Sequence, residues 1–165
     1  MILLIACGNS LRRDDGAGLV LAELLERNWR SGPQEVQQVS VHQLTSDLAE
    51  YIARKEVSVV VFVDSRVAIT GARGFQVQVH KLDLEDSFST TSHHMDPKTV
   101  MLYARFLYNK SPSSWTVTVP GTDYGHGEGL GKVAKRAIAK VTYRDITAPD
   151  VWLVKMAAAA TQQPM

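Results

Sequence analysis

Acidic and histidine side chains follow several of the predicted strands of this sequence. Asp14 and Asp15 come after the apolar run 1–6, and Asp64 ends the apolar run 57–63. Histidines follow two further predicted strands, at His42 and at the pair His93 and His94. Carboxylate oxygens and imidazole nitrogens suit Zn²⁺, Ni²⁺, Mn²⁺ or Fe²⁺, and the same groups act as general acids and bases. Because active sites of α/β proteins gather at the carboxyl ends of strands, the pattern predicts a metal or acid–base site there.

The turn after the first strand favours a cation or a proton over a nucleotide. A buried strand, a glycine-bearing turn and a helix form the usual start of a nucleotide-binding domain. Here Asp14 and Asp15 occupy the place of the phosphate, where their charge would repel it. The chain also lacks a Gly-x-Gly-x-x-Gly pattern, and its second strand ends in His42 instead of a ribose-binding acid. These features argue against a nucleotide-binding domain, which is the first alternative to a metal or acid–base site.

Each candidate residue also has a structural alternative. Asp14 or Asp15 can simply favour the start of the first helix. A carboxylate beside an apolar strand loses hydration, so Asp64 points more strongly to function. Cys7 could be a nucleophile near a histidine, but a small buried residue is the simpler interpretation.

Strand and helix patterns alternate along most of the chain. The predicted strands are 1–6, 35–41, 57–63, 74–80 and 115–119, and the predicted helices are 15–30, 46–52, 97–108 and 130–141. Ser46 and Asp96 are expected to cap the second and third helices, and Phe75, Val77 and Val79 to point inward. The pattern predicts an α/β fold: a single-domain three-layer sandwich with a mostly parallel sheet flanked by helices. The domain is expected to span residues 1–145, with 146–165 as a tail that includes a fraying helix.

The composition of the chain excludes few functions, but its charge balance bears on which classes of partner it binds. The 165 residues include 18 Lys and Arg against 17 Asp and Glu, for a net charge of +1. This balance argues against a general nucleic-acid or membrane binder. The start of the chain lacks the features of a signal peptide, and Cys7 is the only cysteine, so we expect a cytoplasmic protein.

Three motifs in this order resemble the hydrogenase maturation endopeptidases of nickel-iron enzymes. The segment 6–18, Ala-Cys-Gly-Asn-Ser-Leu-Arg-Arg-Asp-Asp-Gly-Ala-Gly, is similar to the family signature Gly-x-Gly-Asn-x-Leu-x-x-Asp-(Asp/Glu)-x-x-Gly. Asp64 matches the second acidic position, and segment 92–95 resembles the family's Ser-x-His-x, which places its histidine at His94. The resemblance covers residues 1 to about 141. Ala6 replaces the first glycine of the signature, which is expected to change how tightly the turn bends.

The resemblance implies a peptidase that removes the C-terminal extension of a hydrogenase large-subunit precursor after nickel insertion. On this basis Asp15, Asp64 and His94 are the catalytic and metal-contacting residues. The nickel belongs to the substrate, and no tightly bound organic cofactor is expected. His42 and Gln43 are expected to bind substrate, and the segment 42–45 resembles the branch that serves bidirectional, NAD(P)-coupled hydrogenases. A non-catalytic nickel-binding assembly factor and an ordinary zinc hydrolase are the remaining alternatives.

Overall fold

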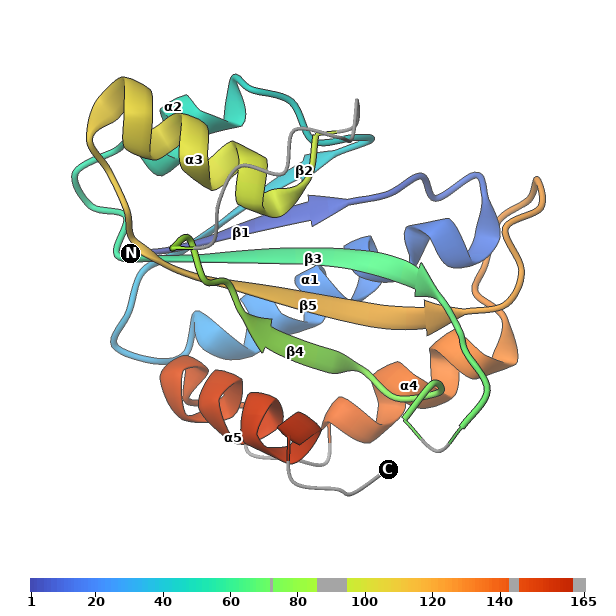
Figure 1. The fold of residues 1–165 in the computed structure, drawn as a ribbon. Helices are drawn as coiled ribbons and strands as arrows, with labels where there is room; N and C mark the ends of the chain where they lie inside the picture. Colours follow the sequence, from blue (N-terminus) through green and yellow to red (C-terminus); the bar gives the residue numbers. More distant parts are fainter. Residues whose placement is uncertain (72, 86–94, 143–145, 162–165) are drawn as a thin grey trace.

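The computed structural model describes residues 1–71, 73–85, 95–142 and 146–161, which form a five-stranded sheet between two layers of helices (Figure 1). The strands are β1 (Ile2–Cys7), β2 (Val36–Val41), β3 (Val59–Val67), β4 (Gln78–Lys81) and β5 (Ser113–Gly121). The helices are a short 3₁₀ helix, η1 (Arg13–Gly16), then α1 (Ala17–Trp29), α2 (Leu48–Ile52), α3 (Pro97–Tyr108), α4 (Lys132–Thr142) and α5 (Pro149–Thr161). The fold confirms the predicted mostly parallel α/β sandwich.

The strand order across the sheet is β2-β1-β3-β5-β4. The first four strands in this order pair in parallel, and β4 pairs antiparallel with β5 at the edge. Parallel strands need helical crossovers, so the central strands are covered on both faces, and β1 and the first half of β3 carry almost only apolar residues. The carboxyl ends of β1, β2, β3 and β5 consequently lie at one edge of the sheet, where the candidate residues were predicted to meet.

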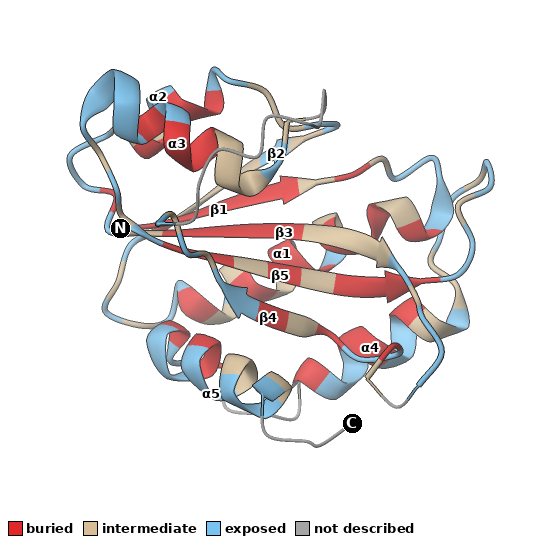
Figure 2. Ribbon diagram, viewed as in Figure 1, coloured by how far each residue is buried: buried red, intermediate tan, exposed pale blue. Residues whose placement is uncertain are grey.

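Two apolar cores lie on the two faces of the sheet. Helices α1, α4 and α5 pack on one face, where Leu21, Ile138 and Trp152 join strand residues such as Val61 and Val63. Helices α2 and α3 pack on the other face, against strand residues that include Ile5 and Phe62. Figure 2 shows the buried residues concentrated in β1, β3 and β5 and on the inner sides of the helices. The alternation along each strand therefore tells which face a side chain occupies.

Strand β3 is longer than the sequence pattern predicts. We expected it to end at Asp64, but it continues to Val67 because β5 pairs with it along its whole length, up to Val67 opposite Gly121. Asp64 therefore lies inside the strand. Since its neighbours Val63 and Val61 belong to the core under α1, the Asp64 side chain lies on the α2 and α3 face.

Other element boundaries also differ from expectation: β5 extends over Ser113–Gly121 and not only 115–119, and η1 precedes α1 where one helix over 15–30 was predicted. Residues 74–77 precede β4 instead of forming it, and Phe75 is 45% exposed although Val77 and Val79 are buried as predicted. Ser46 does not cap α2, which has Asp47 at its N-cap position without a side-chain bond. By contrast, Asp96 caps α3 as predicted, accepting a hydrogen bond of 2.7 Å from the Thr99 N–H.

The tail forms helix α5 and packs into the core. Trp152 is 1% exposed, and its ring lies 5.9 Å from that of Trp29 in an edge-on arrangement. Arg73 also donates a hydrogen bond to the carbonyl of Ala160 near the end of this helix. The predicted helix is thus present, whereas its fraying stays a prediction. Within the described part of the chain, every helix is too short or too polar to cross a bilayer.

Candidate active site

A sharp turn after β1 fixes the position of Asp15. Gly8 has a φ of +147°, and a Cβ there would lie 2.1 Å from the carbonyl oxygen of Asp15, so only glycine fits. The turn brings the Asn9 N–H within 3.0 Å of Asp15 Oδ2, and Asn9 Oδ1 accepts a bond of 2.9 Å from the Leu11 N–H. Ala6 is fully buried inside β1, and the bend occurs at Gly8; the effect of the missing first glycine on the bend stays a prediction.

A second glycine brings the start of α1 against Asp64. A Cβ on Gly18 would lie 2.7 Å from the Asp64 Cα, so the helix can approach β3 this closely only at a glycine. Asp64 is partly buried, and its Oδ1 accepts a hydrogen bond of 2.7 Å from the Ser65 N–H. Burial raises the pKa of Asp64 to about 6; the Ser65 bond opposes this rise, and the charge of Asp15 adds to it. Asp15 and Asp64 therefore form an electrostatically coupled pair.

Asp14 has a different, structural role. Its side chain is 0% exposed and accepts three backbone hydrogen bonds, from the N–H groups of Thr122 (2.8 Å), Asp123 (3.0 Å) and Gly131 (2.6 Å). Burial alone would raise the pKa of Asp14, but these three donors and Arg13 hold it below its ordinary value. Asp14 thus anchors the glycine-rich loop after β5 to the turn after β1. This role is structural, but it differs from the expected one, which was to favour the start of the first helix.

Cys7 lies beside the carboxylate pair as a protonated thiol. Its Sγ donates to the carbonyl oxygen of His42 at 3.5 Å. Burial, together with the charges of Asp64 and Asp15, raises the pKa of Cys7 to about 11. Since the thiolate is the reactive form, this environment favours the interpretation of Cys7 as a packing residue.

The other predicted residues are placed only in part. His42 and Gln43 directly follow β2 at the same edge of the sheet, and both side chains are exposed. His93 and His94 lie outside the described residues. Within the described ranges, no three His, Cys, Asp or Glu side chains are arranged to hold a metal ion. The structure therefore brings together Asp15 and Asp64, while the roles of His94, His42 and Gln43 stay predictions.

Sequence reasoning missed Tyr124. This residue belongs to the glycine-rich loop, and its hydroxyl is buried. Burial raises the pKa of Tyr124; the nearby Ser65 hydroxyl opposes the rise, while Asp14, Asp15 and Asp64 add to it. The sequence signal that could have indicated Tyr124 is a tyrosine in a glycine-rich loop that follows a strand. Its packing partners, however, come from distant parts of the chain.

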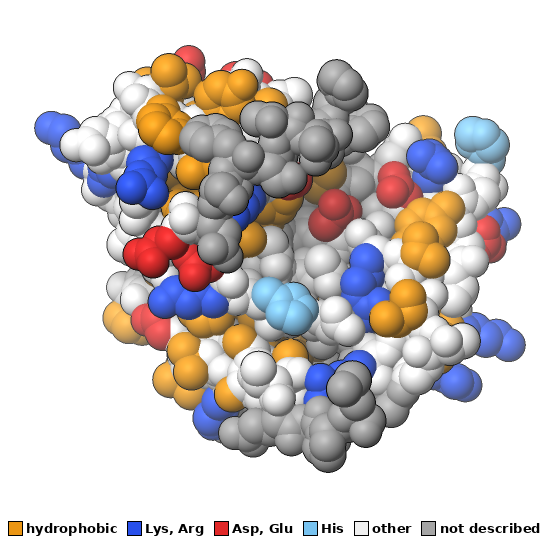
Figure 3. Space-filling model, in the orientation of Figure 1, with side chains coloured by type: hydrophobic (Ala, Val, Ile, Leu, Met, Phe, Trp, Pro, Cys, Tyr) orange, Lys and Arg blue, Asp and Glu red, His pale blue; other side chains and the backbone are white. Residues whose placement is uncertain are grey.

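Acidic side chains border a hollow of the surface beyond the carboxyl end of β1, as Figure 3 shows. A carboxyl group whose pKa is raised to about 6 can act as a base near neutral pH while a neighbouring carboxylate serves as a ligand. The arrangement suits hydrolysis at a polarised carbonyl group. A cysteine nucleophile has no support here, since the raised pKa of Cys7 keeps its thiol protonated at neutral pH.

Comparison with known proteins identifies related folds. No protein-family model and no curated protein matches the sequence. The NiFe hydrogenase maturation protease HycI from Thermococcus kodakarensis is similar in structure, with a TM-score of 0.62 and 19% identity over 88% of this chain and 91% of that one. The endopeptidase HycI from Escherichia coli gives 0.57 and 15% over 89% of each chain. The hydrogenase maturating endopeptidase HybD from E. coli gives 0.55 and 13%, over 96% of this chain and 90% of that one. The chain therefore has the fold of these proteases.

Proposed function

We propose that this protein is a hydrogenase maturation endopeptidase that removes the C-terminal extension of a nickel-iron hydrogenase large-subunit precursor. The main support is the coupled pair of Asp15 and Asp64 at the carboxyl edge of the sheet. The fold shared with solved maturation proteases is the second support. The segment 42–45 favours a precursor of the NAD(P)-coupled group, and the single cysteine favours the cytoplasm.

The proposed reaction uses the nickel of the substrate as the electrophile. Nickel that is already bound to the precursor polarises the scissile carbonyl or acidifies an attacking water. Asp15, held by the Asn9 N–H, contacts this nickel through its carboxylate. Asp64 accepts the proton of the water, because a base with a pKa of about 6 is largely ionised at neutral pH and still basic. His94 is proposed as the third group that contacts the metal.

The nickel requirement separates this proposal from its alternatives. Purified protein is incubated with a large-subunit precursor, with and without loaded nickel, and the mass of the precursor is measured. Loss of a C-terminal peptide from the nickel-loaded form alone supports the proposal. Complex formation with unchanged mass supports a non-catalytic assembly factor, and cleavage that needs zinc on the purified protein supports a zinc hydrolase. Comparing precursors of NAD(P)-coupled and other hydrogenases tests the narrower substrate.

A further inference from the structure

One row of residues crosses the sheet from Asp64 to its free edge. The register places Asp64 opposite Thr118 of β5, and Thr118 opposite Gln78 of β4. Thr118 alternates with the buried Val117 and Val119 of the α1-side core, so it shares the α2 and α3 face with Asp64. Neighbouring strands are about 4.8 Å apart, so the row is about 10 Å long.

Helices α2 and α3 lie mainly over the preceding rows, and the three residues of this row are partly buried. Phe62, one pleat before Asp64 on the same face, is 3% exposed because it packs in the core beneath α3. Across the sheet in the next row, Thr116 is partly buried and His80 is exposed. Figure 1 shows α2 and α3 over the starts of the strands, with the carboxyl ends of β3 and β5 beyond them. Among the described residues, this row and the next one carry hydroxyl, amide and imidazole groups, which bind peptide groups.

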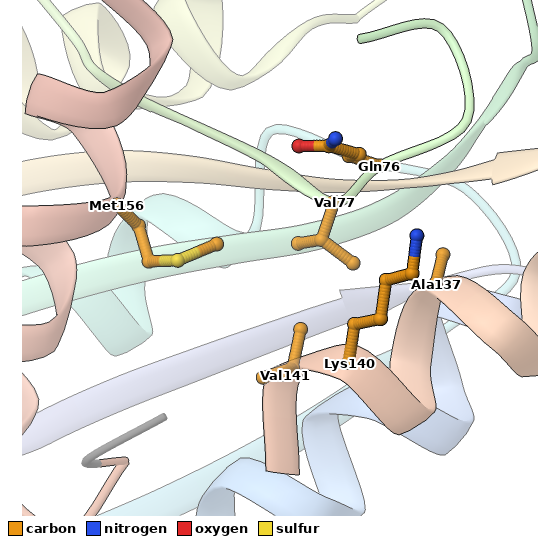
Figure 4. A pocket seen from close by; sticks show the side chains of 6 residues that line it. All are labelled: Gln76, Val77, Ala137, Lys140, Val141 and Met156. Atoms are coloured by element: carbon orange, nitrogen blue, oxygen red, sulfur yellow. The ribbon is translucent and has the colours of Figure 1, made fainter. Parts of the chain in front are cut away.

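The row ends at a hollow of about 260 Å³ between β4 and α5. Its lining residues are Arg73, Gln76, Val77, Gln78, His80, Met156, Ala159 and Ala160. The hollow adjoins a cavity of about 250 Å³, with which it shares Gln76, Val77 and Met156. In Figure 4, Met156 extends from α5 toward Val77, and Lys140 of α4 lines the other side of that cavity. The walls are thus mixed, with apolar side chains beside polar groups.

Arg66 holds one wall of the hollow in a fixed shape. Its guanidinium donates hydrogen bonds to the carbonyl oxygens of Arg73 (3.3 Å), Gly74 (3.1 Å) and Gln76 (2.8 Å). The amide of Gln78 donates to the Arg73 carbonyl as well, at 3.4 Å. A wall held in this way needs little reordering when a ligand binds, which lowers the cost of binding.

We propose that this row and hollow bind an extended peptide segment of the substrate next to the scissile bond. This inference rests on the proposed function. A row of about 10 Å matches about three extended residues, with Thr118 and Gln78 bonding to the peptide backbone. One side chain of the segment enters the hollow beside His80 and Ala159. The row is continuous with Asp64, and its described residues carry hydrogen-bonding groups. Both features favour an extended peptide over a docked helix.

Two pairs of variants test the site with the nickel-loaded precursor. Ala159→Trp fills the hollow from an exposed position of α5, and Ala158→Trp is its matched control, since Ala158 is exposed but does not line the hollow. His80→Ala removes a lining imidazole, and His126→Ala removes an exposed histidine elsewhere. We expect Ala159→Trp and His80→Ala to raise KM about tenfold with kcat nearly unchanged, and both controls to match the parent protein.

Binding is also measured without catalysis. A synthetic peptide that spans the cleavage site is titrated into the isotope-labelled full chain, and amide chemical shifts are followed by NMR. Shifts at Thr118, Gln78 and His80 are expected, with none at His126. If the precursor is cut but KM and shifts are unaffected, the inference is overturned and the proposed function stands. If the shifts occur but the parent protein never cuts the precursor, the peptide site stands and the proposed function fails.

Discussion

Asp14 and Asp15 are neighbours in the sequence, yet their carboxylates accept hydrogen bonds from different segments of the chain. Asp14 accepts three N–H groups of the loop after β5, more than 100 residues away. Asp15 accepts the N–H of Asn9 and adds its charge to the site of Asp64. Asp14 therefore fixes the turn, and the turn positions Asp15. The two adjacent residues have different roles, Asp14 in stability and Asp15 in the candidate site.

Asp64→Asn is expected to abolish processing and to stabilise the protein. Asn keeps an oxygen for the Ser65 N–H but removes a charge whose burial raises the pKa to about 6. Because the pKa of this carboxyl group is higher in the folded than in the unfolded protein, the protein loses stability as pH rises from about 4 through about 6. The variant should therefore exceed the parent by roughly 2 kcal/mol in unfolding free energy at about pH 7.5 and equal it near pH 4. Urea unfolding at both pH values measures this, and a less stable variant at the higher pH would contradict the buried charge.

The rate of processing is expected to depend on pH through Asp64. If its ionised form accepts the proton, kcat/KM rises about tenfold per pH unit below about 6 and becomes constant above it. Initial rates on the nickel-loaded precursor between about pH 5 and 8 give this profile, with circular dichroism to confirm that the fold persists. A rate independent of pH over this interval would remove Asp64 from the role of base.

Asp14→Asn is expected to destabilise the fold by roughly 2–4 kcal/mol, because an amide cannot accept all three N–H groups. The pKa of Asp14 is lowered in the folded state, so its stabilisation is present above about pH 4 and is lost as pH falls through the lowered pKa. Denaturant unfolding and hydrogen exchange at Thr122, Asp123 and Gly131 measure the effect.

The matched control for Asp14 is Asp123→Asn. Asp123 forms a half-exposed ion pair with Arg13 at 3.5 Å, which contributes less than about 1 kcal/mol. Equal stability losses in the two variants would show that the three backbone bonds of Asp14 are not the main connection between turn and loop.

Cys7→Ala is expected to retain processing within about threefold, since a thiol with a pKa of about 11 supplies almost no thiolate at neutral pH. Alkylation of the native protein by iodoacetamide should be correspondingly slow and should accelerate on unfolding. Loss of processing in a variant that is still folded would restore the nucleophilic route for Cys7.

Local patterns predicted most elements of the fold. The apolar runs located β1 and β3, and the pair Asp96 and Pro97 located the start of α3, because strand composition and helix capping depend on near neighbours. The length of β3 was not predictable in this way. Its last residues form a strand because β5 pairs with them, and the local sequence around Val67 does not indicate this pairing.

The candidate site was predicted by position but not by role. Strand ends indicated Asp15 and Asp64, whereas the division of labour between Asp14 and Asp15 depends on the loop donors of residues 122–131. Phe75 was expected inside because it continues an alternating pattern, yet the carbonyl groups around it are gathered by Arg66 into a turn. Both outcomes depend on contacts with segments that are distant in the sequence or lack regular secondary structure, and local patterns do not predict such contacts.

The bond between Asp14 and Gly131 also sets an order of assembly during protein synthesis. The two residues are 117 positions apart, and a ribosome adds roughly 5–20 residues per second. For on the order of ten seconds, the nascent chain therefore carries Asp14 without the donors that bind it. A chain that ends between residues 65 and 121 contains both candidate catalytic carboxylates but not the loop that binds Asp14. The site is thus completed only after all five strands of the sheet have been made.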